Sequence, residues 1–298
     1  MAIDLNKIKY FRAVATTLNI SKASKLVNLS QPALSLQMQN LEHEIGASLF
    51  TRSNRGLILT EAGHTLLARS HMLQNWERDT LDELGEALSP SGELKIGTYT
   101  TASSYLLAPK LKAFLKQYPD LSITYDYSDT DTIIEKIKTL ELDMAVISEV
   151  PDDPGIESLP FYKNELVLAA AATSKVAKSI AAKELALWPK LSYPLKLDYC
   201  YREVERKLGK YLSLAPTVIE SVSFDTLKQS LLHDLGLCFM PLYLIEEELK
   251  SKKLKRVEVQ GLKLSITFSL VFKRGHRLSR RVQVFKDYLC SITMINNV

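Results

Sequence analysis

The 298-residue sequence has few cysteines, no long apolar run and none of the common catalytic motifs. Its three cysteines, Cys200, Cys238 and Cys290, lie far apart without a CxxC pair, so neither a disulfide framework nor a zinc site is supported. The longest nearly apolar stretches, 166–172 and 235–245, are shorter than the roughly 18 to 20 residues of a membrane-spanning helix. P-loop, GxGxxG, GxSxG and HExxH motifs are missing. We therefore expect no enzyme, no metal, no cofactor and no membrane partner.

The composition predicts a folded protein of two or three domains, because 46% of the residues are hydrophobic and 24% are charged. The net charge of +4 is unevenly placed: residues 250–298 hold 12 basic and 2 acidic side chains, and residues 1–63 hold 7 and 4. Such basic ends are compatible with polyanion binding but do not establish it. The first residues lack the basic head and apolar run of a signal peptide, so we expect a cytoplasmic protein.

The first 60 residues have the pattern of a helix-turn-helix. Ile8, Phe11, Ala15 and Leu18 recur at helical spacing and predict a first helix. Ser21 is a candidate cap for a second helix, which breaks at 29–32. A third helix is predicted from Gln31 or Pro32, with Ser30 as its cap, and to end at Gly46.

The third helix has one apolar and one polar side. Its inner side is formed by Leu34, Met38, Leu41 and Ile45. Its outer side holds Pro32, Ser35, Leu36, Gln39 and His43. Two short strands, one starting at 49–50 and one at 57–59, predict a hairpin or wing after it.

A long helix is predicted from Glu61 to about Leu88, with Thr60 as its cap. Its apolar stripe is too long to be covered by a domain of about 60 residues, so we expect a dimer in which a partner helix covers it. Residues 89–92, Ser-Pro-Ser-Gly, then form a clear linker.

The remaining chain alternates between strands and helices, which is typical of an α/β fold with a mainly parallel sheet. Two α/β lobes with a cleft between them are the simplest arrangement. The expected strands are 94–97, 121–127, 144–148, 166–171, 216–219 and 237–240, and the expected helices are 106–118, 133–140, 203–212, 225–232 and 282–292.

Three N-terminal stretches closely resemble the DNA-binding head of LysR-type transcriptional regulators: SKASxL at 21–26, LSQPALSxQMxxLExEIGxxLFxR at 29–52 and LTEAG at 59–63. The resemblance continues through Gly97, Pro109, Phe114, Tyr118-Pro119, Leu140, 143–146, Gly236 and Pro241. It implies a winged helix-turn-helix (1–63), a linker helix and hinge (64–91), and a two-lobed effector domain similar to type 2 periplasmic binding proteins (92–298). Lobe I is expected at about 92–162 and 268–298, and lobe II at about 163–267.

The function that follows is a sequence-specific transcription regulator controlled by a small-molecule effector. Its expected partners are double-stranded DNA, the effector and further copies in a homodimer or homotetramer, with RNA polymerase as a further partner to consider. The candidate DNA-binding residues lie on the second and third helices and the wing: Lys22, Lys25, Ser30, Gln31, Pro32, Ala33, Ser35, Leu36, Gln39, Arg52 and Arg55. Among them, Ser35, Leu36 and Gln39 are expected to read base edges.

The candidate effector site lies where hydroxyl-bearing residues follow strands and precede helices, an arrangement that favours an anionic or carbonyl-bearing ligand. Asp129 and Asp131 nearby disfavour a heavily charged anion. For each hydroxyl, a role as a helix cap is an equal alternative. The candidate residues, several of them from the family resemblance, are Thr100, Thr101, Ser103, Ser128, Thr130, Ser148, Tyr201 and Phe224.

The sequence departs from the family pattern at Leu36, Gln39 and Asn40, where basic residues are common, and at Asp234, where glycine is common. The alternative function is therefore a ligand-binding or redox-sensing protein with weakened DNA binding. Relatives that sense oxidants near Cys200 use a second, closely spaced cysteine, which is missing here, so we favour a small half-buried thiol. Trp76 favours dimer packing, and the basic run 250–256 favours a solvated surface over a tetramer or DNA contact.

Overall fold

The computed structural model describes residues 4–53, 56–84, 90–148, 150–194 and 199–292. Residues 199–202 are described by their backbone alone. Close contacts divide the chain into two compact units, one formed mainly by residues 1–88 and one by most of 89–298. Each unit is described by itself below. No helix in the described ranges has the length and hydropathy needed to span a bilayer.

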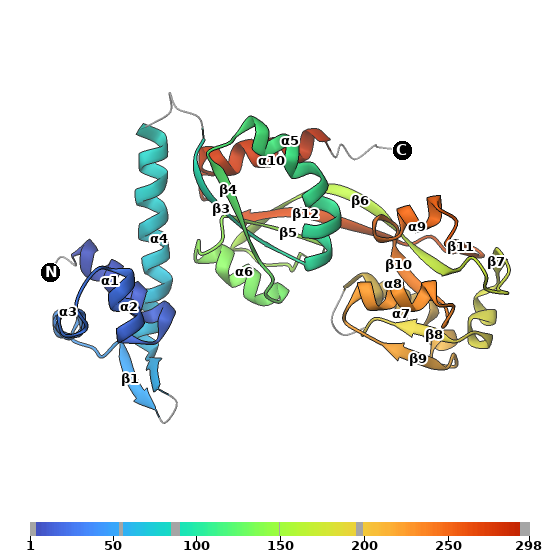
Figure 1. Ribbon diagram of the computed structural model, residues 1–298, viewed down its shortest axis with the longest axis horizontal. Helices are drawn as coiled ribbons and strands as arrows, with labels where there is room; N and C mark the ends of the chain where they lie inside the picture. The colour runs from blue at the N-terminus through green and yellow to red at the C-terminus, as the bar shows by residue number, and fades with distance from the viewer. Residues whose placement is uncertain (1–3, 54–55, 85–89, 149, 195–198, 293–298) are drawn as a thin grey trace. The chain divides into compact units, whose positions relative to one another are not determined.

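The N-terminal unit begins with α1 (Leu5–Thr17), α2 (Ile20–Leu26) and α3 (Gln31–Ile45) (Figure 1). The prediction that Ser21 caps α2 is wrong, since the Asn19 side chain accepts from the backbone N–H of Lys22 and the helix starts one residue after Asn19. The Ser30 cap of α3 is confirmed by its bond from the N–H of Ala33, and Gly46 ends the helix with φ 76°.

The core of this unit lies between the three helices and the start of the wing. The wing consists of β1 (Phe50–Ser53) and β2 (Gly56–Leu59), an antiparallel pair. Glu42 fixes the entry to β1, because its Oε1 accepts from the N–H groups of Leu49 and Phe50 at 2.7 and 3.1 Å. The buried residues are Phe11, Val14, Ala15, Ala23, Leu34, Met38, Leu41 and Leu49.

Helix α4 (Glu61–Leu84) follows β2 and is about 36 Å long at 1.5 Å per residue. Thr60 caps it: the hydroxyl accepts from the N–H of Gly63 at 3.0 Å and donates to the carbonyl of Ser48 at 2.6 Å. The start of α4 lies so close to Leu49 that there is no room for a side chain at Gly63, where a Cβ would lie 2.2 Å from the carbonyl oxygen of Leu49. The predicted extension of the helix to Leu88 falls on residues outside the described ranges.

The second unit opens with the parallel strands β3 (Gly92–Thr98), β4 (Leu121–Asp126) and β5 (Met144–Ile147). Helix α6 (Thr130–Lys138) covers one face of these strands, and α5 (Ala108–Gln117) and α10 (Arg280–Ile292) cover the other (Figure 1). The predicted helix 106–118 starts earlier, because a π-helical segment, η1 (Ala102–Leu107), runs into α5. The predicted helix 133–140 also starts earlier, because Asp129 accepts from the N–H of Thr132.

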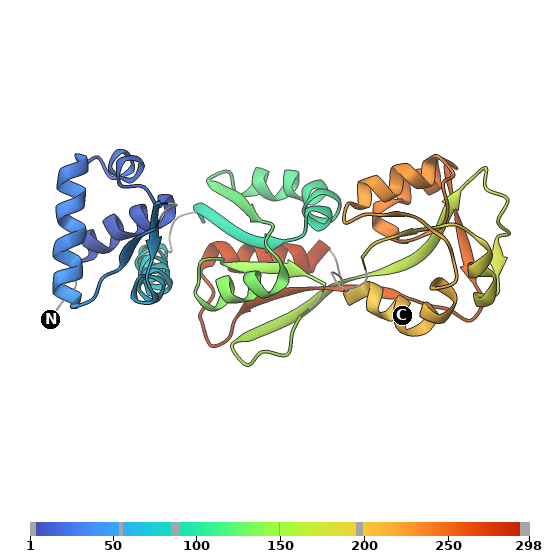
Figure 2. The same ribbon diagram turned by 90° about the horizontal axis from the view of Figure 1, so that it is seen from below.

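The expectation of a mainly parallel sheet is wrong at its centre. The strand order is β4-β3-β5-β12-β6-β11-β7, and β12 (Ser265–Lys273) is antiparallel to both β5 and β6 (Ile156–Ala171). The chain leaves lobe I along β6 and returns along β12, so these two strands run in opposite directions between the lobes (Figure 2). Their register shifts between Phe268 and Ser269, which leaves Phe161 as an extra residue on β6.

Lobe II is built on the far half of β6, which pairs with β10 (Cys238–Pro241) and β11 (Leu254–Val259), both antiparallel to it. The short strand β7 (Ser179–Ile180) continues this sheet. A second, parallel pair is formed by β8 (Lys190–Ser192) and β9 (Thr217–Glu220). The helical segments are η2 (Ala182–Leu187), α7 (Tyr199–Leu212), α8 (Phe224–Leu232), η3 (Leu242–Leu244) and α9 (Glu246–Lys250).

The basic run 250–256 lies mainly at the surface, as predicted, since Lys250, Lys252, Lys253 and Arg256 are exposed. It covers the end of α9, a turn and the first half of β11, where Leu254 is buried. The ammonium of Lys255 donates to the carbonyls of Ser174 and Val176 at 2.6 and 2.9 Å. Arg256 forms an ion pair with Glu165 on the neighbouring strand β6.

Candidate functional site

The outward side of α3 is available to a partner. Leu34, Met38 and Leu41 are buried in the N-terminal core, which fixes the rotation of the helix. The side chain of Leu36 is 55% exposed, Gln39 is exposed and Ser35 is half-buried. These three predicted base-reading residues therefore lie on the side of α3 that faces away from the core.

Basic side chains flank this face. Lys22 and Lys25 are exposed on α2, and Arg52 is exposed on β1. No carboxylate in the described part of the chain forms an ion pair with any of these three residues. Lys7 on α1, by contrast, is paired with Glu44. The predicted residue Arg55 lies outside the described residues.

The start of α3 carries the other predicted DNA contacts. Gln31 and Pro32 are exposed, and Ala33 is half-buried. Ser30 is exposed but its hydroxyl is used for the cap. Pro32 has no backbone N–H, so it leaves no donor unsatisfied in the first turn.

In the second unit, a cavity of about 200 Å³ lies between lobe I and lobe II at the carboxyl ends of β3 and β5. Four of the predicted effector residues line it: Thr100 and Thr101 after β3, Ser148 after β5, and Phe224 at the start of α8. The hydroxyl of Thr98 faces inward and donates to the carbonyl of Val146 at 2.8 Å, which holds β3 against β5. The cavity is thus formed by turns at strand ends, as the sequence pattern indicates.

Three other predicted residues are not in the lining, and two of them, Ser103 and Thr130, lie within hydrogen-bond distance of lining residues. The Ser103 hydroxyl is 3.0 Å from the hydroxyl of Tyr127, which lines the cavity, and Ser103 also donates to the carbonyl of Thr100. Thr130 Oγ1 is 3.1 Å from the hydroxyl of Tyr99, another lining residue. Ser128 accepts from the ammonium of Lys136. The side chain of Tyr201 lies outside the described residues.

Apart from Phe224, sequence reasoning missed the aromatic walls of the cavity. Tyr193 stacks on Phe224, with ring centroids 4.7 Å apart and an angle of 14° between the planes. Tyr127, Tyr193 and Tyr243 come from three segments far apart in the chain. A signal was present, since each tyrosine comes directly after or close to a strand end. The complete lining is Thr98, Tyr99, Thr100, Thr101, Tyr127, Ser148, Tyr193, Val222, Phe224, Pro241, Tyr243, Ile266 and Phe268.

Among the residues that the structure describes, the lining consists of hydroxyl-bearing, aromatic and aliphatic side chains, and none of them is charged. Asp126 and Lys136 form a charge pair next to Ser128. Burial alone would raise the pKa of Asp126, but the hydrogen bonds from Lys136 and Ser128 outweigh it and lower the pKa below its ordinary value. This lysine is therefore already neutralised by a carboxylate.

A polar contact joins the lobes beside the cavity. The hydroxyl of Tyr105 on η1 donates to Asp225 at 2.7 Å and accepts from the buried ammonium of Lys228 on α8 at 3.1 Å. Lys228 also lies 3.4 Å from a carboxylate oxygen of Glu248. The hydrogen bond to Asp225, together with burial, raises the pKa of Tyr105, so the phenol stays protonated as the donor.

The two units match two family models. Residues 5–64 match the bacterial regulatory helix-turn-helix protein, lysR family, and residues 87–291 match the LysR substrate binding domain. The chain belongs to the LysR family. It is a transcription regulator with a DNA-binding head and an effector-binding domain, as the sequence motifs predicted.

Curated relatives resemble this LysR regulator over nearly its whole length. The RuBisCO operon transcriptional regulator of Allochromatium vinosum is 27% identical over 296 residues, covering 98% of this chain and 97% of the relative. The transcriptional activator CmpR of Synechocystis is 27% identical over 294 residues, covering 96% and 94%.

Solved structures share the fold of this LysR regulator. A full-length OxyR variant from Pseudomonas aeruginosa has a TM-score of 0.73 at 20% identity, with 98% of this chain and 97% of OxyR covered. Full-length CbnR complexed with its target DNA has a TM-score of 0.67 at 20% identity, with 96% and 99% covered. The Synechocystis CcmR regulatory domain, in complex with 2-PG, has a TM-score of 0.61 at 21% identity, with 69% and 99% covered.

Proposed function

We propose that this LysR regulator reads DNA by placing α3 in the major groove. The observation that carries the proposal is the exposed side of α3, flanked by lysines and an arginine that have no carboxylate partner among the described residues. Gln39 is suited to hold adenine through two hydrogen bonds, and Leu36 to lie against a thymine methyl group. Ser35 adds a hydroxyl that bonds either to a base or to a phosphate.

We assign the remaining predicted residues to the phosphate backbone. Lys22, Lys25, Arg52 and Arg55 neutralise phosphates, which fixes the register without reading the sequence. The segment Ser30–Ala33 brings the positive end of α3 towards the phosphate backbone. Because few cations contact the phosphate backbone, base contacts carry a larger share of the affinity than in family members with basic residues at positions 36, 39 and 40.

We infer that the regulator acts as a homodimer or a homotetramer. Helix α4 supports the dimer, because Trp76 is 69% exposed and Leu73 is 43% exposed on a helix that needs an apolar partner. DNA binding is assigned to 1–63, dimerisation to 64–91 and effector binding to 92–298. We take the cytoplasm as the location of the regulator, because its target is genomic DNA, and RNA polymerase is a further partner to test.

We propose that the inter-lobe cavity binds the effector without chemical change. Its lining offers hydroxyls from Thr100, Thr101 and Ser148 and flat rings from Tyr193 and Phe224. The described part of the lining holds no cation, so a multiply charged anion would lose its hydration there without gaining a counter-charge. The lining favours a small uncharged or singly charged molecule with a carbonyl or hydroxyl group and a planar part.

Ligand binding then shifts the balance between two arrangements of the lobes and hence of the dimer on DNA. A change in half-site spacing or DNA bend alters promoter occupancy. By linkage, the factor by which the effector changes DNA affinity equals the factor by which DNA changes effector affinity.

The test is fluorescence anisotropy of the full chain with a duplex from upstream of its own gene and a scrambled duplex, at two salt concentrations. We expect tighter binding of the upstream duplex and a loss of affinity with salt for both. If both duplexes bind equally at low and high salt, α3 does not read sequence. If neither binds while small molecules still raise the Tm, the chain is a ligand-binding protein with weakened DNA binding.

A further inference from the structure

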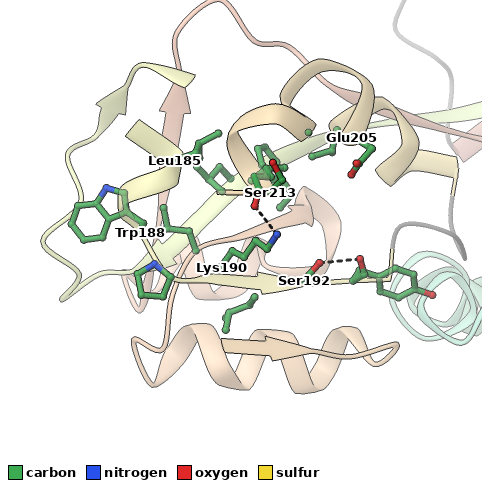
Figure 3. Close-up of a pocket in the computed structure, with 15 residues that line it drawn as sticks. Leu185, Trp188, Lys190, Ser192, Glu205 and Ser213 are labelled. Carbon is green, nitrogen blue, oxygen red and sulfur yellow. Dashed lines mark hydrogen bonds between the residues drawn. The ribbon is translucent and has the colours of Figure 1, made fainter. Parts of the chain in front are cut away.

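A second cavity lies inside lobe II, away from the strand ends that form the effector cavity. It has a volume of about 260 Å³ and is bounded by η2, β8 and α7 (Figure 3). A single water needs roughly 10 to 15 Å³ of such space, so this cavity is large enough for a small organic molecule. It is larger than the effector cavity, at about 200 Å³.

The walls of this lobe II pocket are mainly apolar. Leu185 and Trp188 come from η2 and the residue that follows it, Val204 and Leu212 from α7, and Phe239 from β10. Such a lining favours an apolar body and a small number of polar contacts. The pocket exists partly because position 209 of α7 is a glycine, which has no side chain to fill it.

One cation points into this apolar space. Lys190 extends from β8 towards the end of α7, where its Nζ donates to the carbonyl of Leu212 at 2.6 Å (Figure 3). No ion pair of Lys190 exists within the described ranges. Two other half-buried or buried lysines of the same unit do have carboxylates, Lys136 with Asp126 and Lys228 with Glu248.

A positive charge against apolar walls is costly unless an anion compensates it. The ammonium of Lys190 has three protons, of which the Leu212 carbonyl takes one, so two remain for a ligand. A carboxylate is the anion of matching size. Glu205, also on the wall, is exposed to solvent, which screens its repulsion of such a ligand.

We propose that the lobe II pocket is a second small-molecule site that binds an amphiphile with one carboxylate and an apolar body of one ring or a short alkyl chain. The carboxylate bonds to Lys190 and the body packs on Leu185, Trp188 and Phe239. Tyr193 lines both this pocket and the effector cavity, so the occupant contacts a residue that the effector also meets.

The experiment is isothermal titration calorimetry of the full chain with octanoate and with its neutral analogue octanamide. We expect saturable binding of octanoate, about tenfold to hundredfold tighter than octanamide, because a hydrogen bond to a charged group is replaced by a neutral one. Lys190→Gln should bring the two ligands to similar affinity. Lys183→Gln, which removes an exposed charge from η2 outside the pocket, should leave the preference unchanged.

Two further variants locate the ligand. Gly209→Leu fills the pocket and should abolish binding of both ligands, and its circular dichroism spectrum and Tm show whether it folds. Thr100→Trp narrows the effector cavity and should leave octanoate binding intact.

Two results with the unmodified chain would overturn the proposal: no saturable binding of octanoate, or equal binding of octanoate and octanamide. Two results with the variants would do the same. These are loss of octanoate binding in Thr100→Trp but not in Gly209→Leu, and retention of the octanoate preference in Lys190→Gln.

Discussion

Replacing Gly63 by alanine should separate the linker helix from the DNA-binding head. A Cβ at this position would lie 2.2 Å from the carbonyl oxygen of Leu49 and 2.8 Å from a methyl group of Leu59. The first of these neighbours is backbone and cannot turn away. The start of α4 must therefore move off the wing.

The size of the effect follows from what the movement breaks. The N–H of Thr60 donates to the same Leu49 carbonyl at 3.0 Å, and the Thr60 hydroxyl donates to Ser48 at 2.6 Å. Each hydrogen bond contributes about 1 kcal/mol, and the crowding itself costs about 1 to 3 kcal/mol. We expect a loss of about 3 to 5 kcal/mol in the free energy of unfolding of the N-terminal unit, which for a domain of this size is a fall in Tm of about ten degrees or more.

The assay is thermal unfolding of the full chain by circular dichroism, with hydrogen exchange of peptides from 42–63 to localise the change. Gly209→Ala is the matched control: its Cβ meets only the flexible carboxylate of Glu205 at 3.1 Å, and alanine is the better helix former by about 1 kcal/mol. If Gly63→Ala leaves the Tm and the hydrogen exchange of 42–63 unchanged, the approach of Gly63 to the Leu49 carbonyl does not contribute to stability and the prediction is wrong.

The other predictions concern recognition, the lobe contact and acid stability. Gln39→Ala should reduce the preference for the cognate duplex by about 1 to 3 kcal/mol, whereas Arg52→Ala should weaken binding of all duplexes alike and reduce the salt slope by about 1. Anisotropy titrations at several salt concentrations separate these two effects. An unchanged preference in Gln39→Ala would contradict the docking of α3. Tyr105→Phe removes the hydrogen bonds between η1 and α8 and should raise the rate of ligand release in stopped-flow experiments; an unchanged rate would show that the contact does not hold the lobes. The pKa of Asp126 in the folded state lies below its ordinary 3.8, so its ion pair with Lys136 stabilises the fold above pH 3.8 and this stabilisation is lost as the pH falls through the folded pKa. Lys136→Met should therefore flatten the acid limb of a curve of Tm against pH. If the acid limb is not flattened, this pair is not the source of the acid dependence.

Local signals predicted the N-terminal unit almost to the residue. The start of α3 is set by Ser30 and Pro32 and its end by Gly46, all of which act through neighbouring backbone groups. Two predictions there were wrong. At the start of α2 two good caps compete, and Asn19 wins over Ser21. Leu18, predicted as part of the first helix, instead follows its end at φ 46° and is 42% exposed.

The second unit was harder because its features are made by distant segments. Strand β12 has no partner near it in sequence, and its antiparallel pairing with β5 and β6 depends on the chain returning from lobe II. The effector cavity shows the same limit. Thr100 and Ser148 could be found from strand ends, but the walls formed by Tyr193 and Tyr243 depend on how lobe II packs.

The lobe II pocket was missed for a related reason. An isolated lysine in an ordinary short strand carries no sequence signal, and Lys190 becomes unusual only when the fold surrounds it with apolar walls. The structure of the N-terminal, DNA-binding unit is therefore easier to predict from the sequence than that of the second unit.

The extra residue Phe161, opposite the step between Phe268 and Ser269, is a β-bulge in the connection between the lobes. A bulge bends its strand and increases the local twist. The direction in which β6 enters lobe II is therefore set by this one position as well as by the packing of the lobes.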